Sequence, residues 1–522
     1  MLALMLFTGI MLSVRSGFFQ IRKFPKILKS TVFSKSEKNE EISPFAAMCQ
    51  ALAATLGTGN IAGVSTAVAI GGAGAVFWMW VSAVFGMMTG FAENVLGLMY
   101  RKKENGVYKG GAMYYIRDGL AENPKTRKLS RPLSVMYAFL CVASGFGMGN
   151  AAQMNSASEA MKSGFGVPAV VTGVVLAVLA AFIVFGGAKR ISSFSAKIVP
   201  LMSAFYIIGC VYILMRNIGN LPDVFGSIFK SAFGLSQIGG GVAGTAVKTA
   251  VSMGFKRGVF SNEAGLGTSV FAHTASGIQN PAVCGMWSVF EIFFDTIVMC
   301  SLTALTLLSS PCNVPMSYEV LDSVGTDAEY FRVTDSERLI TEGIAMPSEL
   351  ECITADGKSV TAEVKSEGIC YSNLFSVVGN VEGGEIVSAR IEPIVGVGLV
   401  EYAFSQTFGK FAGGILAVLV VMFAFSTVLG WSYFAGEAVE FLWGKRLRKP
   451  FCVVFVAFSV IGAVVNMSFA WGAADLMNGL MAIPNLTAVI LLSGKAVKAA
   501  REAFPKRKAV LRNEEPPKRI SD

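Results

Sequence analysis

A short segment of glycine and polar residues, Gly57-Thr58-Gly59-Asn60, interrupts an apolar stretch that runs from Ala51 to Trp80. Glycine loses the most backbone freedom in a helix, and a break leaves N–H and C=O groups without intrahelical partners. At membrane depth such groups are tolerated where they line a cavity or hold a ligand. A lone glycine would more often allow close helix packing. Thr58 and Asn60 add polar side chains, so the segment predicts a binding site in a broken membrane helix.

A break of this kind could satisfy both charges of a zwitterion such as an amino acid. The N-terminus of a half-helix presents N–H groups to a carboxylate, while unwound carbonyls and hydroxyls hold a cation. Thr58, Gly59 and Asn60 are the anion-facing break in this interpretation. A counterpart is expected in the second half of the chain, and two segments fit: Gly241 to Thr245, or Phe260 to Asn262, which includes Ser261.

The composition indicates that these segments lie in lipid. Of the 522 residues, 53% are hydrophobic and only 15% are charged, whereas soluble domains carry about 25% charged residues. About eleven apolar runs approach the roughly 20 residues that cross a bilayer. These predicted spans are Met1–Val14, Phe45–Ile70, Ala75–Met99, Leu133–Met161, Val167–Phe185, Ile198–Met215, Gly239–Phe255, Val283–Leu308, Phe411–Phe434, Phe451–Met467 and Leu476–Leu492.

Basic residues predict the orientation, because Lys and Arg accumulate in cytoplasmic loops. With the N-terminus outside, the loop from Arg15 to Lys38, the pair Lys256-Arg257 and the tail from Lys495 all become cytoplasmic. We therefore predict a multi-pass cell-membrane protein with transmembrane residues 1–310 and 396–494 and a basic cytoplasmic tail, 495–522. The first run lacks a basic region before it, so it is interpreted as an anchor and not as a cleaved signal peptide.

The segment 311–395 has a different character. It contains fifteen acidic and five basic residues, a net charge of −10. Short alternating runs at Leu350–Ile353, Ser359–Val364 and Glu385–Ile391 indicate a compact β-rich insertion, which the span count places outside the membrane. Cys312, Cys352 and Cys370 lie in it, and any two could pair in an oxidising compartment. The other six cysteines are expected in the membrane core.

Eight motifs in one order resemble the alanine/glycine:cation symporter family. They are GTGNIAGVS (57–65), GGAGAVFWMW (71–80), GGAMYYI (110–116), GNAAQMNS (149–156), FKRGVFSNEAGLG (255–267), FDTIVMCSLTAL (294–305), FAFSTVLGW (423–431) and WGAADLMNGLMAIPN (471–485). The resemblance implies an all-α, LeuT-type fold with an inverted 5+5 helix repeat plus one N-terminal helix. It also implies sodium-coupled import of small neutral amino acids, chiefly alanine and glycine, without a cofactor.

The resemblance also implies roles for further residues. Gln153 and Asn262 join Thr58, Gly59, Asn60 and Ser261 as substrate ligands, while Asn155 fits an interhelical hydrogen bond equally well. Ser426 and Thr427 resemble a sodium site completed by backbone carbonyls near Leu56 and Gly57, since hydroxyl and carbonyl oxygens suit a hard cation. Trp431 would cap the pocket or only pack.

Ionisable residues within spans are functional candidates by default. Glu291 and Asp295 lie four residues apart on one helix face and could form a proton or cation path. We favour structural pairing with Lys or Arg near the cytoplasmic ends. Glu93 and Glu263 are also treated as structural, and the single histidine, His273, cannot form a metal cluster or catalytic triad alone.

Two other classes of protein compete with a transporter. An enzyme would need an activated nucleophile or a metal, and the sequence has no pair of histidines, no HExxH motif and no nucleophile elbow. A receptor reporting through the acidic insertion is the better rival, and within transport proton coupling is the near alternative. We expect a lipid bilayer, sodium and an amino acid as partners, and no nucleic acid.

Overall fold

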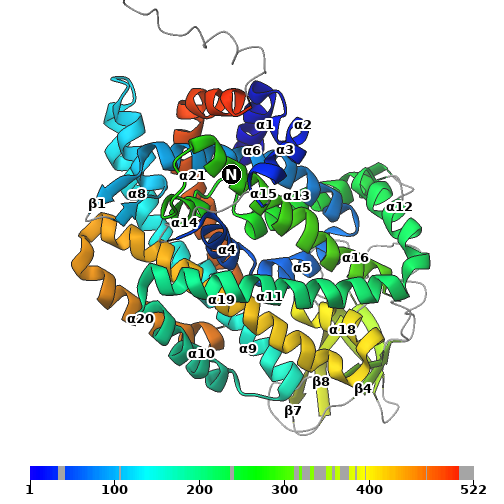
Figure 1. Cartoon of the computed structure of the whole chain (residues 1–522). Helices are drawn as coiled ribbons and strands as arrows, with labels where there is room; N and C mark the ends of the chain where they lie inside the picture. Colours follow the sequence, from blue (N-terminus) through cyan, green and yellow to red (C-terminus); the bar gives the residue numbers. More distant parts are fainter. Residues whose placement is uncertain are drawn as a thin grey trace, which may run out of the picture.

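The structure is a computed structural model that describes residues 1–32, 42–104, 107–234, 240–310, 396–465 and 467–504, together with six strands between 311 and 395. Helices make up most of this part of the chain (Figure 1). Seven helical stretches are long and apolar enough to cross a membrane: Gly74–Tyr100, Arg127–Phe165, Gly187–Arg216, Pro281–Ser309, Val397–Trp443, Lys445–Val464 and Ala470–Glu502.

An eighth candidate span is bent. The helices Pro44–Thr55 and Thr58–Gly71 are together long and apolar enough to cross, and they meet at 63°. Leu2–Ser16 and Ala169–Val184 are apolar but shorter. The described residues therefore give seven or eight spans by length and composition, and the count of about eleven stays a prediction.

Several spans consist of consecutive helical pieces. The long spans contain α6 (Gly74–Tyr100), α8 (Arg127–Phe146), η3 (Gly147–Ala151), α9 (Ala152–Phe165), α11 (Gly187–Arg216), α15 (Pro281–Ile292), η5 (Phe293–Cys300), α16 (Ser301–Ser309), α18 (Val397–Phe408), η6 (Gly409–Phe411), α19 (Ala412–Trp443), η7 (Lys445–Leu447), α20 (Arg448–Val464) and α21 (Met467–Glu502). Both η3 and η5 are π-helical, a widening of the helix that often marks functional sites.

The other helices lie outside these seven stretches. They are α1 (Leu2–Ser16), α2 (Phe19–Arg22), α3 (Phe24–Ser30), α4 (Pro44–Thr55), η1 (Thr58–Asn60), α5 (Ala62–Gly71), α7 (Ala112–Tyr114), η2 (Tyr115–Gly119), α10 (Ala169–Val184), η4 (Ile218–Asn220), α12 (Leu221–Ala232), α13 (Gly240–Asn262) and α14 (Ser269–Thr274). Strands β1 (Lys102–Glu104) and β2 (Val107–Lys109) form an antiparallel hairpin between α6 and α7.

Small residues let the central helices approach closely. A Cβ atom at Gly254 of α13 would lie 2.5 Å from the carbonyl oxygen of Ala75 in α6, and one at Gly90 of α6 would lie 2.5 Å from Ser288 Oγ in α15. Close backbone contact of this kind drives helix association in lipid, where apolar burial alone does not. Helix α6 is thereby packed tightly against α13 and α15.

Between 311 and 395 the described residues form one sheet in the order β3-β4-β5-β6-β8-β7. All neighbouring strands are antiparallel except β6 and β8. The strands are β3 (Ser317–Glu319), β4 (Tyr330–Val333), β5 (Glu349–Thr354), β6 (Ser359–Val364), β7 (Phe375–Glu382) and β8 (Glu385–Pro393). The three alternating runs of the sequence lie in β5, β6 and β8.

The cysteines divide as the sequence indicated, as far as the structure describes them. Cys312 and Cys370 lie outside the described residues, so the predicted disulfide is untested. The six cysteines of the helices are free and buried: Cys49, Cys141, Cys210, Cys284, Cys300 and Cys452.

The sheet and the β1–β2 hairpin lie far apart. In Figure 1, β4, β7 and β8 lie at the bottom beside α18, while β1 lies at the left near the junction of α19 and α20. Helix α21 continues to Glu502, so the predicted tail begins inside a helix.

Candidate functional site

The first break lies between α4 and α5, and Gln153 of α9 contacts it. The Thr58 N–H and the Thr58 hydroxyl each donate to Gln153 Oε1 at 3.0 Å. Gln153 Nε2 donates to the Met148 carbonyl at 3.2 Å, within the π-helical turn before α9. An amide side chain therefore satisfies an N–H group that the break leaves without a helical partner.

Gly57 is the point where three helices converge. A Cβ atom there would lie 2.6 Å from Thr427 Oγ1 and 2.8 Å from Gln153 Oε1, so only glycine fits without a shift. Thr427 Oγ1 lies 3.1 Å from the Ala53 carbonyl of α4 and 3.1 Å from the Phe423 carbonyl of its own helix. Leu56 is fully buried beside Gly57. The structure thus brings Leu56, Gly57, Thr427 and Gln153 together.

Asn60, at the other end of η1, binds a second group of polar residues. Its Nδ2 lies 2.9 Å from Ser261 Oγ and 2.8 Å from Asp295 Oδ1. The Thr303 hydroxyl donates to the Asn60 carbonyl at 2.7 Å. Residues from α13, η5 and α16 thereby meet at the break, and Thr58, Gly59 and Asn60 are all buried.

Asp295 lies in the π-helical piece η5 and is fully buried. Its Oδ2 accepts hydrogen bonds from Ser261 Oγ at 2.7 Å and from Thr296 Oγ1 at 2.8 Å. In the described part of the chain Asp295 forms no ion pair with Lys or Arg. The expected pairing with a basic residue is therefore wrong for Asp295, which lies in the candidate site.

Glu291 and His273 form a separate pair. His273 Nε2 lies 3.0 Å from Glu291 Oε2, and both side chains are buried. The partner of Glu291 is therefore a histidine and not the expected Lys or Arg. This pair joins α14 to α15.

The second break follows Asn262. Helix α13 is continuous from Gly240 to Asn262, so the alternative break at Gly241 to Thr245 is wrong. Glu263, Gly265 and Gly267 then adopt positive φ angles of 54°, 99° and 71° before α14 begins. The segment Phe260 to Asn262 is the last helical turn before this break.

Asn262 stabilises the end of α13. Its Oδ1 accepts from the Ala264 N–H at 3.0 Å, and its Nδ2 donates to Thr296 Oγ1 at 3.0 Å. Phe260, two residues earlier, limits the space at the first break, because a Cβ at Gly59 would lie 3.1 Å from its ring. The last turn of α13, just before the second break, therefore contacts the first break.

Three other candidates have their hydrogen bonds elsewhere. Ser426 Oγ donates to the Phe423 carbonyl at 2.9 Å, within its own helix. The Trp431 indole N–H donates to Glu263 Oε1 at 3.0 Å, which ties α19 to the second break. Asn155 Nδ2 donates to the Val465 carbonyl at 2.6 Å, which is the interhelical bond left open by the sequence.

Arg257 does not lie in a loop. Its side chain is buried, and its guanidinium lies 4.9 Å from the centre of the Trp471 ring. Neighbouring Lys256 pairs with Asp475 of α21 at 2.7 Å. Both basic residues belong to α13, which continues to Asn262 and so extends beyond the predicted end of this span at Phe255.

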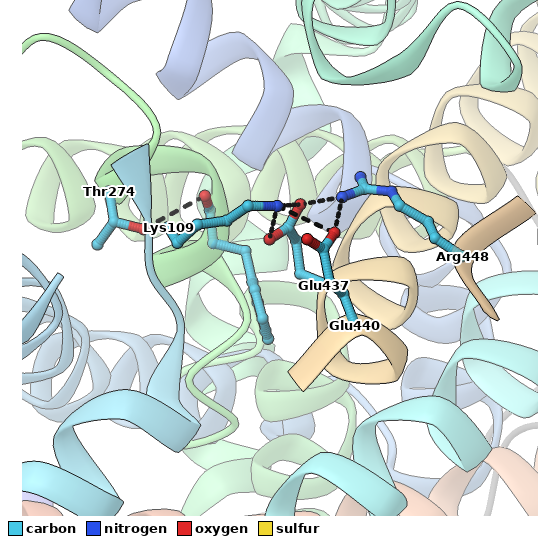
Figure 2. Close-up of polar contacts among 6 residues, drawn as sticks. Lys109, Thr274, Glu437, Glu440 and Arg448 are labelled. Atoms are coloured by element: carbon cyan, nitrogen blue, oxygen red, sulfur yellow. Dashed lines mark hydrogen bonds and ion pairs between the residues drawn. The ribbon is translucent and has the colours of Figure 1, made fainter. Parts of the chain in front are cut away.

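A cluster of charged side chains lies at the end of α19, away from both breaks. Figure 2 shows Lys109 and Arg448 on either side of Glu437 and Glu440. Lys109 Nζ lies 3.0 Å and Arg448 Nη1 2.9 Å from Glu440 Oε2. The cluster ties the β1–β2 hairpin to α19 and α20, as a structural lock would.

Sequence reasoning missed the place of Asp295, Thr296 and Thr303 in the site. Thr296 and Thr303 look like ordinary span residues, because a threonine in a membrane helix usually bonds its own backbone. The signal that could have found the site is Asp295 itself, since an acidic residue within an apolar span is expensive and normally functional.

A broken span with a buried polar site is typical of a multi-pass membrane transporter, and the family that the chain matches consists of symporters and not enzymes. The chain belongs to the sodium:alanine symporter family, whose model matches residues 1–329 and 369–516. It is 36% identical to "Sodium/alanine symporter AgcS" of Methanococcus maripaludis over 96% of this chain and 93% of that protein. It is 30% identical to "Putative sodium/proton-dependent alanine carrier protein YrbD" of Bacillus subtilis over 95% and 87%.

Among solved structures, the Eremococcus coleocola manganese transporter is similar at a TM-score of 0.46 and 12% identity, over 89% of this chain and 82% of that one.

Proposed function

We propose that this protein is a sodium-coupled symporter that imports small neutral amino acids, alanine and glycine, by alternating access. The observation that carries the proposal is the broken span α4–η1–α5, whose Thr58 N–H and Asn60 side chain meet partners from three other helical pieces in the protein interior. Membership of the sodium:alanine symporter family supports the same activity.

The substrate would bind where Gln153 contacts Thr58. A carboxylate replaces Gln153 Oε1 as the acceptor at the Thr58 N–H, and the freed amide then serves the zwitterion as donor or acceptor. Asn60, Ser261 and Asn262 complete the polar wall, and Trp431 supports it through Glu263. The close approach of Phe260 to Gly59, where a Cβ would lie 3.1 Å from the ring, supports a site for a small amino acid, so leucine and phenylalanine should bind weakly.

Sodium would bind beside Thr427. Its hydroxyl lies at the broken helix already, near the Ala53 carbonyl, and the carbonyls of Leu56 and Gly57 follow directly. Ser426 is the further ligand, and its hydroxyl must turn away from the Phe423 carbonyl to reach the ion. A cation here would hold α19 against the first break and favour the substrate-ready state. No other cofactor is required.

The architecture proposed for this activity is the LeuT-type 5+5 inverted repeat with an additional N-terminal helix. Each repeat would begin with a broken span, the first at α4–α5 and the second at α13–α14. The three further spans that this architecture requires are α1, α10 and α13.

Uptake of labelled alanine into proteoliposomes tests the proposal. Uptake should require an inward sodium gradient, fail when choline replaces sodium, and be inhibited by unlabelled glycine more strongly than by leucine. Counterflow against preloaded alanine excludes a receptor, because a receptor binds without exchange. Alanine uptake that ignores sodium would refute the proposal.

Proton coupling is the second candidate, and Asp295 is the observation that favours it, because a buried carboxyl can carry a proton. The relative YrbD is named a sodium/proton-dependent carrier. A protonophore separates the candidates: collapse of uptake in sodium-free buffer assigns the proton, and persistence of sodium-driven uptake assigns sodium.

The proposed orientation places the N-terminus and residues 311–395 outside the cell membrane and the C-terminus in the cytoplasm. The six described helix cysteines are buried, so a membrane-impermeant maleimide, applied to intact cells after mild reduction, should react with Cys312, Cys352 or Cys370. The variant with serine at these three positions is the control. Labelling that appears only after lysis would reverse the orientation.

A further inference from the structure

Two hollows lie at the end of α21, away from both helix breaks. The first has a volume of about 470 Å³ and lies between Met99 of α6, the start of α15 and the last turns of α21. The second, of about 360 Å³, lies between Arg15 at the end of α1 and the same turns of α21. Lys498 and Glu502 line both, so the two hollows adjoin each other.

Positive charge gathers in the second hollow. Arg15, Lys498 and Arg501 line it. Among the described residues that line it, Glu502 is the one that carries a negative charge. In the described ranges none of the three basic side chains forms an ion pair with a carboxylate. Like charges that are brought together without compensation attract an anion.

Hydrogen bonds hold the two arginines beside each other, where α1 and α21 end together (Figure 1). Arg15 Nη1 donates to Ser493 Oγ at 2.6 Å, and Arg501 Nη2 donates to the Arg15 carbonyl at 2.8 Å. Each guanidinium has five N–H donors, so most of them remain for another ligand. The planar guanidinium matches the oxygens of a phosphate, and Lys498 adds a compact positive charge. The second hollow therefore suits a phosphate group.

The position of the hollow favours a lipid as the source of that phosphate. The apolar stretch Ala470–Glu502 has 33 residues, which rise about 50 Å, whereas the hydrocarbon core is about 30 Å thick. Its basic last turns belong in the headgroup region, because Lys and Arg are costly in hydrocarbon. On α1, the exposed side chains Phe7, Ile10 and Val14 form one apolar stripe. An acyl chain packed along this stripe would place its phosphate at Arg15, the next residue.

We propose that Arg15, Lys498 and Arg501 bind the phosphate of an anionic phospholipid between α1 and α21. Basic pockets between membrane helices bind anionic headgroups in this way. The site goes beyond the proposed amino-acid transport and does not depend on it. The lipid joins the first helix of the chain to the last described one and compensates the repulsion among the three cations. It therefore stabilises the folded protein, as a ligand does that binds the folded state only.

Thermal unfolding of the purified full-length protein in a neutral detergent tests the site. Phosphatidylglycerol added to the wild type should raise the melting temperature, and phosphatidylcholine, whose headgroup has no net charge, should raise it much less. The double variant Lys498→Gln/Arg501→Gln should need at least about tenfold more phosphatidylglycerol for half of the rise, because losing a hydrogen bond to a charged group typically costs that factor or more.

Lys445→Gln/Arg446→Gln is the matched control. It removes the same two charges from η7, whose side chains line neither hollow, and it should respond to phosphatidylglycerol like the wild type. An equal response to the two lipids in the wild type, or an equal loss of response in the two double variants, would overturn the site.

Two further measurements keep the test decisive if the variant at Lys498 and Arg501 does not fold. Glu502→Gln removes the negative charge that lines both hollows, so half of the rise should need less phosphatidylglycerol than in the wild type; a higher requirement would contradict the site. Inorganic phosphate at the same concentration as the lipid should leave the melting temperature unchanged, because it has no acyl chain to pack on α1. A rise equal to that with phosphatidylglycerol would assign the hollow to a soluble anion and overturn the lipid site.

Discussion

The two helix breaks differ in the interactions that stabilise them. The first, at Leu56 to Asn60, is satisfied by amide, hydroxyl and carboxylate side chains of other helices, which can exchange one partner for another. The second, at Glu263 to Gly267, bends through positive φ angles and is fixed by bonds to its backbone: Tyr137 donates to the Leu266 carbonyl at 2.8 Å and Asn485 to the Gly265 carbonyl at 2.8 Å. This difference supports the proposal that the first break binds the ligand, while the second fixes the conformation of the chain.

Changes at the second break should therefore affect folding first. Gly267→Ala places a Cβ at φ 71° and 2.8 Å from the Ala112 Cβ. Left-handed strain of about 1 to 2 kcal/mol adds to an overpacking cost of about 1 to 3 kcal/mol. We expect loss of most folded protein in detergent, measured by fluorescence-detected size exclusion.

Gly166→Ala is the matched control for Gly267→Ala. Gly166 has a φ of 67° but nothing within 4 Å of its Cβ position, so the control carries only the strain. A melting temperature lowered equally by both substitutions would show that packing at the second break contributes nothing.

Changes at the first break should abolish transport and leave a folded protein. Gly57→Ala introduces no left-handed strain, since φ is −113°, but its Cβ meets Thr427 Oγ1 and Gln153 Oε1. We expect alanine uptake to fall by at least about tenfold, because a rise of about 1.4 kcal/mol in the activation free energy of transport already gives that factor. Gly494→Ala, with nothing near its Cβ, should transport normally. If the Gly57→Ala variant aggregated, the first break would also be required for folding, and the contrast with the second break would fail.

Thr427 and Ser426 provide a smaller contrast within the first break. Thr427→Ala removes the hydroxyl at the Ala53 carbonyl and should raise the half-saturating sodium concentration several-fold, with uptake partly recovered at high sodium. Ser426→Ala, whose hydroxyl now bonds its own helix, should have the weaker effect. By reciprocity, Thr427→Ala should also weaken alanine affinity at fixed low sodium. A larger rise in the half-saturating sodium concentration for Ser426→Ala than for Thr427→Ala would instead make Ser426 the main sodium ligand.

The sequence predicted the first break well because its signal is local. Two glycines around a threonine weaken an apolar helix at one point, and the bend of 63° falls at these residues. The position of the second break could not be decided from the sequence. Gly239-Gly240-Gly241 resembles a break, yet Gly240 and Gly241 are helical. The positive φ of Glu263, where the helix does end, has no sequence signature. The predicted end of the span at Phe255 is too early for a related reason: the charges of Lys256 and Arg257 look like the end of an apolar run, yet α13 continues to Asn262.

The partners within the site were the hardest to predict. Gln153, Ser261 and Asp295 lie 95, 201 and 235 residues from their partners at the first break, so their contacts depend on helix packing. The many basic residues of the sequence favour a structural pair for Asp295, and only the packed structure shows that Asn60, Ser261 and Thr296 surround it.

The central claim is that the first break binds the amino acid, and Asn60 tests it most directly. Equilibrium binding of labelled alanine at saturating sodium should be weaker in Asn60→Ala by about 5- to 150-fold, which corresponds to about 1 to 3 kcal/mol for a lost buried partner. Asn155→Ala removes an amide whose bond goes to Val465 and should bind alanine like the wild type. Unchanged affinity in Asn60→Ala would contradict the account and place the substrate elsewhere.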